Sequence, residues 1–100
     1  MRAGRFVVGP LDETMPPKPD WRELKESHEI VGIGTIFWDG ENPKVHLHAG
    51  FGKRDEVRLG CIREGSQTFL VLEAVIMEIE GMDGAVRALD PATGLSLLKL

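Results

Sequence analysis

The segment Lys44–Phe51 alternates polar and apolar residues with a period of two, and no other feature constrains the fold of this chain as strongly. Successive side chains of a β-strand point to opposite faces, so the pattern predicts a strand with one apolar and one polar face. The apolar face carries Val45, Leu47, Ala49 and Phe51, and the polar face carries Lys44, His46, His48 and Gly50. We therefore expect this strand to support a core on one side and to present two histidines on the other.

Three further short segments predict strands, namely Arg5–Val8, Ile30–Trp38 and Val57–Ile62. They are rich in β-branched and apolar residues and are bounded by glycine, proline or charged turn residues. The second of them contains Gly32 and Gly34, and glycine inside a strand indicates a bulge or the close approach of another backbone. An antiparallel-rich sheet is the expected framework.

One short helix is predicted beside this sheet. Asp20 and Glu23 have the spacing of a capping box, which opens a helix over Trp21–Ser27. The segment Arg87–Leu100 is expected to form a turn and an apolar tail. No repeat or linker divides the chain, so residues 1–100 are expected to form a single α+β domain, an antiparallel-rich sheet with one or two short helices.

Charge and cysteine content limit the function classes. The 100 residues include 16 acidic and 12 basic side chains, a net charge of −4, whereas phosphate binding needs basic residues gathered on one face. No apolar stretch approaches the roughly 20 residues of a transmembrane helix, so no membrane partner is expected. A single cysteine, Cys61, excludes an internal disulfide and favours the reducing cytoplasm. A domain this short buries only about two-thirds of its unfolded surface, so a partner subunit or a metal would add stability.

His46 and His48 are the first candidates for a functional site. Residues i and i+2 of a strand project from one face with their bases about 6–7 Å apart, so both imidazoles can reach one metal ion. Cys61 lies on the next expected strand, across a loop at Gly52–Glu56 that is short enough for a hairpin. Its side chain shares the histidine face only if Cys61 pairs directly with His46 or His48, because a slip of one residue turns it over. A His-His-Cys set with an open fourth position is typical of a catalytic zinc site, so zinc or another divalent transition metal is the expected cofactor.

A purely structural interpretation competes with the metal site. The His-x-His pattern is only moderately specific, and a lone cysteine such as Cys61 is more often a small buried hydrophobic residue than a ligand. His28, at the end of the expected helix, is a further potential ligand, but we expect it to cap the helix C-terminus instead. Only the combination of histidines and cysteine on adjacent strands makes metal binding competitive with packing.

The segment Thr68–Ile79 is the longest apolar run, and Glu73 interrupts it. Its length alone would allow a helix, but its β-branched content and flanking turns favour a strand, buried on both faces at its centre. An unpaired carboxylate there would cost several kcal/mol, so we expect Glu73 to pair with an arginine or to lie at an edge open to solvent. The arginines considered are Arg58, Arg63 and Arg87. The catalytic alternative is that Glu73 acts as a general base beside a metal-bound water.

Taken together, several runs resemble the plants and prokaryotes conserved (PPC) domain, a family of unknown function with a DNA-binding label. The resemblance rests on the His-x-His-Ala of His46–Ala49, on Leu59–Ile62, on Glu64 with Gly65, and on the apolar run around Glu73. The tail Arg87–Leu95 also resembles the family's closing segment, and the similarity covers roughly residues 30 to 97.

The resemblance implies an α+β sheet fold that assembles as a homotrimer, with a metal-binding histidine cluster in some prokaryotic members. The fold is similar to that of zinc-dependent acetolactate decarboxylase and of a zinc ester hydrolase, although fold does not fix function. Two departures stand out. Cys61 replaces the third family histidine, and a thiolate is itself a good zinc ligand. The similarity also begins later than in the family, so the usual N-terminal strand–helix–strand segment is expected to be missing.

These observations lead to one expectation and one alternative. We expect a small trimeric PPC-like protein of the cytoplasm, with a candidate metal site at His46, His48 and Cys61 and a transcription-associated role, as the family label implies. The alternative is a zinc-dependent lyase or hydrolase that acts on a small carbonyl or ester substrate, where the metal polarises an oxygen or activates water. Direct DNA binding ranks third, because the resemblance attributes DNA contact in plant members to a separate AT-hook and this acidic chain has none.

Overall fold

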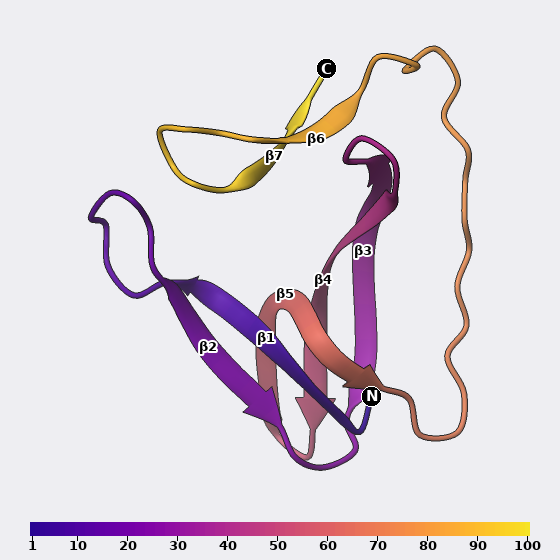
Figure 1. The fold of residues 1–100 in the computed structure, drawn as a ribbon. Coiled ribbons are helices and arrows are strands. Elements are labelled where there is room, and N and C mark those ends of the chain that lie inside the picture. Colours follow the sequence, from indigo (N-terminus) through magenta and orange to yellow (C-terminus); the bar gives the residue numbers. More distant parts are fainter.

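The computed structural model describes residues 1–100 and contains seven strands in one mixed sheet, with no helix. The strand order is β2-β1-β5-β4-β3-β6-β7 (Figure 1). The strands are β1 (Ala3–Pro10), β2 (Pro19–Leu24), β3 (Glu29–Trp38), β4 (Pro43–Lys53), β5 (Glu56–Gln67), β6 (Val86–Leu89) and β7 (Ser96–Lys99). All neighbours are antiparallel except β3 and β6, which are parallel. The α+β class expected from the sequence is therefore wrong, because the chain is all-β.

The helix predicted over Trp21–Ser27 is absent, and its first four residues belong to strand β2. Leu24 is the one buried residue of the segment, and it pairs with Gly4 of β1. A helix of seven residues is marginal in water, because its few hydrogen bonds do not offset the unfavourable free energy of nucleation. Pairing with β1 satisfies the same backbone groups and buries the leucine. The capping-box spacing of Asp20 and Glu23 is therefore outweighed by sheet pairing.

The four short strands predicted from the sequence are confirmed as β1, β3, β4 and β5, and a small core lies against them. That core consists of Phe6, Leu24, Ala49 and Phe51, with the rings of Phe6 and Phe51 4.6 Å apart. The apolar face of β4 is covered only at its C-terminal end, since Val45 on the same face is 64% exposed. The predicted alternation is thus correct, but much of the apolar face has no partner within the chain.

Two glycines bring β3 close to the part of β4 that carries the histidines. A Cβ added to Gly32 would lie 2.7 Å from the carbonyl oxygen of His48, and one added to Gly34 would lie 2.9 Å from the Cα of Leu47. Real side chains do not tolerate such contacts with backbone, so both positions require glycine. This confirms the close backbone approach that the two glycines predict.

The apolar run Thr68–Ile79 is not a strand, contrary to the prediction. After Gln67 the chain leaves the sheet and runs as an extended segment on the side of β3 away from β4 until it reaches β6 (Figure 1). We call residues 68–80 the arm; all of its residues are exposed, with Leu70 at 84% and Val75 at 92%. A strand needs a neighbour to supply its hydrogen bonds, and no other segment of the chain pairs with the arm.

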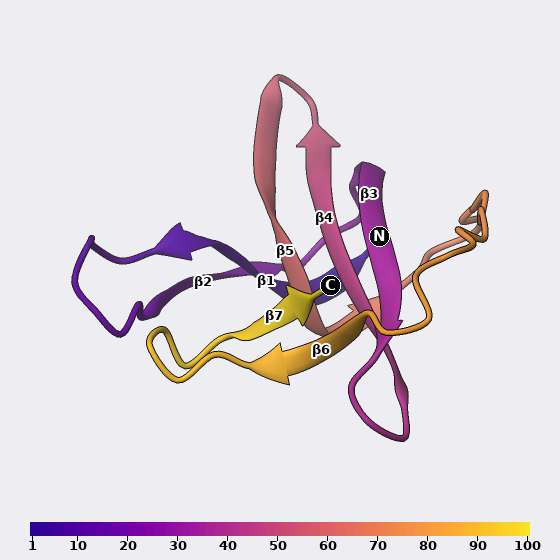
Figure 2. The same cartoon turned by 90° about the horizontal axis from the view of Figure 1, so that it is seen from above.

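The C-terminal segment forms the hairpin β6–β7 instead of a free tail. Its turn is closed by the carboxylate of Asp90, which accepts hydrogen bonds from the backbone and hydroxyl of Thr93 at 3.1 and 2.8 Å. The hairpin joins the sheet through the single pair of Trp38 with Val86 and runs across the end of β3 (Figure 2). The chain contains no helix with the length and apolarity required to cross a membrane.

Candidate metal centre

Strand β4 holds His46 and His48 in a geometry that suits one metal ion. Their Nε2 atoms are 3.2 Å apart, and the rings meet edge to face at 86°. Two nitrogen ligands of a tetrahedral zinc, each bound at about 2.0–2.1 Å, lie about 3.3–3.4 Å apart. The two imidazoles therefore need almost no movement to share an ion.

Cys61 of β5 completes the set. It pairs directly with His48, which meets the register condition under which its side chain shares the histidine face. Strand β1 flanks the other side of Cys61 through Val7, and the cysteine is only 4% exposed. The ligand atoms of the three residues all lie within 4.8 Å of one another. The structure thus brings together the three residues that the sequence singles out.

Arg87 of β6 contacts this cluster, and the sequence gives no signal of the contact. Its Nη2 donates hydrogen bonds to Nδ1 of His46 at 3.1 Å and to the hydroxyl of Thr35 at 3.0 Å. Because a guanidinium only donates, Nδ1 of His46 carries no proton, and the neutral ring holds its proton at Nε2. That proton is donated to Nε2 of His48. In this state neither ring nitrogen of His46 offers a free lone pair, so metal binding through Nε2 requires the Arg87 contact to give way.

The electrostatics of the cluster favour neutral imidazole. The pKa of His46 is lowered from its ordinary value of 6.5, chiefly because partial burial disfavours the charged ring. The neighbouring groups Arg87, His48 and Arg63 lower this pKa further. Neutral imidazole is the charge state that binds metal ions, so the environment favours the charge state that a ligand needs, and Nε2 becomes free to bind once the Arg87 contact gives way.

A groove of about 550 Å³ opens beside the cluster, and His48 and Cys61 form part of its wall. Two cationic side chains, Lys18 and Arg63, line it together with apolar residues that include Trp21. No aspartate or glutamate contributes to its lining. The cluster therefore faces a cavity that is large enough for a small molecule and carries only positive charge.

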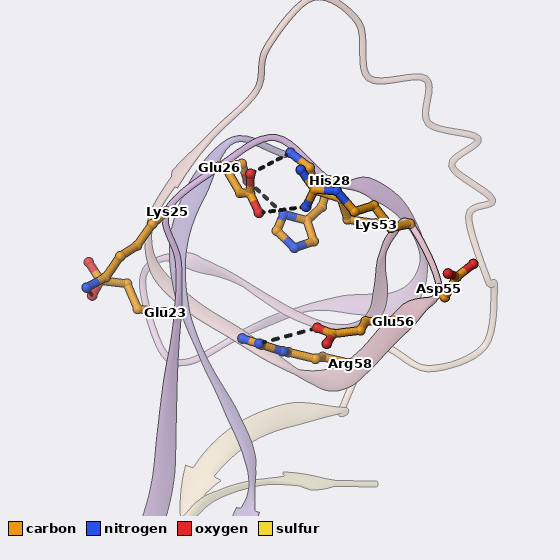
Figure 3. Close-up of a pocket in the computed structure, with 9 residues that line it drawn as sticks. Glu23, Lys25, Glu26, His28, Lys53, Asp55, Glu56 and Arg58 are labelled. Carbon is orange, nitrogen blue, oxygen red and sulfur yellow. Dashed lines mark hydrogen bonds and ion pairs between the residues drawn. The ribbon is translucent and has the colours of Figure 1, made fainter.

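His28 lies elsewhere, in a charged pocket of about 470 Å³ (Figure 3). Its Nδ1 contacts the carbonyl oxygen of Glu26 at 2.7 Å, and there is no helix for it to cap, so that prediction is wrong. The carboxylate of Glu26 points toward Lys53 at 2.8 Å, and this contact is the main reason that the pKa of Glu26 is lowered. Most of the pocket's charges are paired with one another, and His28 does not belong to the metal cluster.

Glu73 lies in the arm, where it is exposed and forms no hydrogen bond or ion pair. The predicted burial of the segment's centre and the pairing with an arginine are therefore wrong, whereas the alternative of a position open to solvent agrees with its exposure. Arg58 instead pairs with Glu56, and Arg87 with His46. The structure does not bring Glu73 to the cluster or to the groove. Its role as a general base stays a prediction.

Comparison with known proteins gives one match. Residues 4–80 match the model of the Plants and Prokaryotes Conserved (PCC) domain, the family abbreviated PPC above. The match begins and ends earlier than the similarity placed from the sequence, so it contains all three candidate ligands and the arm but not Arg87 or the hairpin β6–β7. No curated protein and no solved structure matches the chain.

Proposed function

This chain belongs to the Plants and Prokaryotes Conserved domain family, and we propose that it is a metal-binding member with a site at His46, His48 and Cys61. The observation that carries the proposal is the 3.2 Å separation of the two Nε2 atoms, with Cys61 in register on the neighbouring strand. Two neutral imidazoles and one thiolate suit zinc or a similar divalent transition metal. Such an ion supplies Lewis acidity, which polarises an oxygen of a bound molecule.

A cobalt titration tests this site. Cobalt(II) added to metal-free protein should bind at about one equivalent per chain and give the near-ultraviolet charge-transfer absorption of a thiolate ligand. Because Cys61 is the only cysteine, Cys61→Ser should remove that absorption. His28→Ala, which changes a histidine outside the cluster, is the matched control and should leave the titration unchanged. Wild-type protein without the thiolate band would contradict the proposal.

The groove beside the cluster supports a second, catalytic candidate. A zinc-dependent lyase or hydrolase needs a cavity next to its metal, and this groove borders both His48 and Cys61. Turnover of a small activated ester by zinc-loaded protein, lost in the His46→Ala/His48→Ala double variant, would support that candidate. Equal rates for the two proteins would contradict it.

We also propose that the chain self-associates, as a homotrimer in line with its family resemblance. Its accessible surface is 7952 Å², whereas a compact monomer of 11.1 kDa has about 5,700 Å². The radius of gyration is 15.1 Å against about 13 Å for a compact domain of 100 residues. An excess of about 2,300 Å² is the size of an obligate subunit interface.

Two apolar surfaces contribute to this excess. One is the arm; the other is the outer edge of β3, which β6 pairs only at Trp38 and where Val31 and Ile33 are 80% and 82% exposed. An open sheet edge and an extended apolar segment are complementary, because each offers the backbone hydrogen bonds that the other lacks. We propose that the arm of one copy covers β3 of another. Native mass spectrometry should find a trimer, and a monomer at micromolar concentration would contradict the proposal.

Eight of the 12 lysine and arginine side chains already pair with carboxylates, which weakens the case for DNA contact. We propose that any transcription-associated role of this cytoplasmic protein runs through protein partners. Salt-dependent retention on DNA would contradict this.

A further inference from the structure

Two of the lysine and arginine side chains that lack a carboxylate partner line the same groove. The four residues outside the ion pairs are Arg2, Lys18, Arg63 and Arg87. Arg2 donates to the side chain of Gln67 and Arg87 to the ring of His46, whereas Lys18 and Arg63 line the groove. In a chain of net charge −4, two of the four unneutralised cations thus lie in one cavity.

The remaining lining defines what this positive charge can bind. The groove has no acidic residue to neutralise Arg63 and Lys18, and it offers apolar surface from Trp21 and Leu59. Its volume of about 550 Å³ falls within the range of about 300–1,000 Å³ that is typical of small-molecule sites. Cations in a concave, partly apolar cavity concentrate small anions, even where the molecule as a whole is negative.

We propose that this groove binds a small organic carboxylate. Arg63 and Lys18 hold the carboxylate, and the apolar part of the ligand packs against Trp21 and Leu59. A guanidinium matches a carboxylate through two parallel hydrogen bonds, and the apolar wall favours an organic acid over an inorganic anion. The inference deepens the proposed function by naming a ligand class for the same cavity, but the carboxylate contacts do not require a bound metal.

Calorimetric titration of the metal-free protein with three probes tests the proposal. Phenylacetate carries both the charge and the apolar group, phenylacetamide has the same shape without the charge, and inorganic phosphate has charge alone. We expect phenylacetate to bind at least tenfold more tightly than either of the others. Equal binding of phenylacetamide, or no binding of phenylacetate, would overturn the proposal.

Variants locate the site. Arg63→Gln should weaken phenylacetate binding about tenfold, the loss expected for one charge-assisted hydrogen bond, and Lys18→Gln should weaken it less. Arg58→Gln is the matched control, because Arg58 pairs with Glu56 outside the groove, and its affinity should equal that of the wild type. Unchanged binding in Arg63→Gln would overturn the assignment. Because these titrations contain no metal and the cobalt titration contains no carboxylate, each proposal can fail without the other.

Discussion

Nη2 of Arg87 lies 3.1 Å from Nδ1 of His46, so a residue outside the family-matched segment contacts a candidate metal ligand. The hairpin β6–β7 positions this arginine, and Thr35 accepts a second hydrogen bond from it. The contact assigns the proton of His46 to Nε2, the nitrogen that faces His48. Arg87 and a metal ion therefore compete for the same imidazole.

Removal of this contact should strengthen metal binding. We expect Arg87→Met to lower the dissociation constant for zinc about tenfold, because the ion no longer displaces a charge-assisted hydrogen bond and repulsion between two cations is relieved. Competition with a chromophoric chelator measures the constant. Arg58→Met removes an equivalent charge from an ion pair away from the cluster and should leave the constant unchanged. Weaker zinc binding in Arg87→Met would show that the arginine supports the site instead of competing for it.

The close approach of β3 to β4 predicts a specific sensitivity at Gly34. Gly34→Ala should lower the free energy of unfolding by about 1–3 kcal/mol, because the added Cβ would meet the backbone of Leu47 at 2.9 Å. Urea unfolding measures the difference. Gly84→Ala is the control, since no atom lies within 4 Å of its added Cβ and its φ is not in the left-handed region. Equal stabilities of the two variants would contradict the packing described for these strands.

The lowered pKa of His46 predicts how the stability of the metal-free protein responds to pH. The unfolded chain protonates this histidine near its ordinary pKa of 6.5, while the folded chain resists protonation. Below that pH the unfolded state binds more protons and is favoured, so the free energy of unfolding should fall as pH decreases from about 7.5 to 5.5. The free energy of unfolding of His46→Asn should fall less steeply over this range, and that of the control His28→Asn should follow the wild type. Parallel slopes in wild type and His46→Asn would refute the shift.

Self-association should depend on the arm and on the outer edge of β3. A lysine at either surface would bury a charge in the interface, so Ile33→Lys and Val75→Lys should each shift the molecular mass toward the monomer in light scattering. Met15→Lys is the control, because Met15 is also exposed, at 63%, but lies in the loop between β1 and β2, outside both surfaces. If all three variants keep the wild-type mass, the interface lies elsewhere.

The histidine pair was predictable from the sequence, and its cysteine partner was predictable only conditionally. The alternation around His46 and His48 fixes their common face whatever the neighbouring strands do. The facing of Cys61 depends on the register, which follows from the turn at Arg54 and Asp55, because Lys53 pairs with Glu56. The loop expected from the sequence spans all of Gly52–Glu56, and a loop of that length does not determine the register. A two-residue turn there leads by simple counting to the pairing of His48 with Cys61.

Other features depend on contacts that local patterns do not contain. The capping-box spacing of Asp20 and Glu23 indicates a helix, but the edge of β1 offers the segment more hydrogen bonds as strand β2. The β-branched arm has the composition of a strand, yet composition does not say which chain supplies its neighbour. Arg87 reaches His46 only because β6 joins β3 at Trp38, which no short-range signal indicates.

The metal content of the purified protein tests the central claim most directly. Elemental analysis of untagged wild type, beside the His46→Ala/His48→Ala double variant, should find about one transition-metal ion per chain in the first and none in the second. Circular dichroism spectra and native masses should match between the two proteins, which would show that the loss of metal comes from the missing ligands and not from unfolding. A wild type without metal after reconstitution with zinc, or a double variant that keeps its metal, would contradict the assignment of His46, His48 and Cys61 as the ligands.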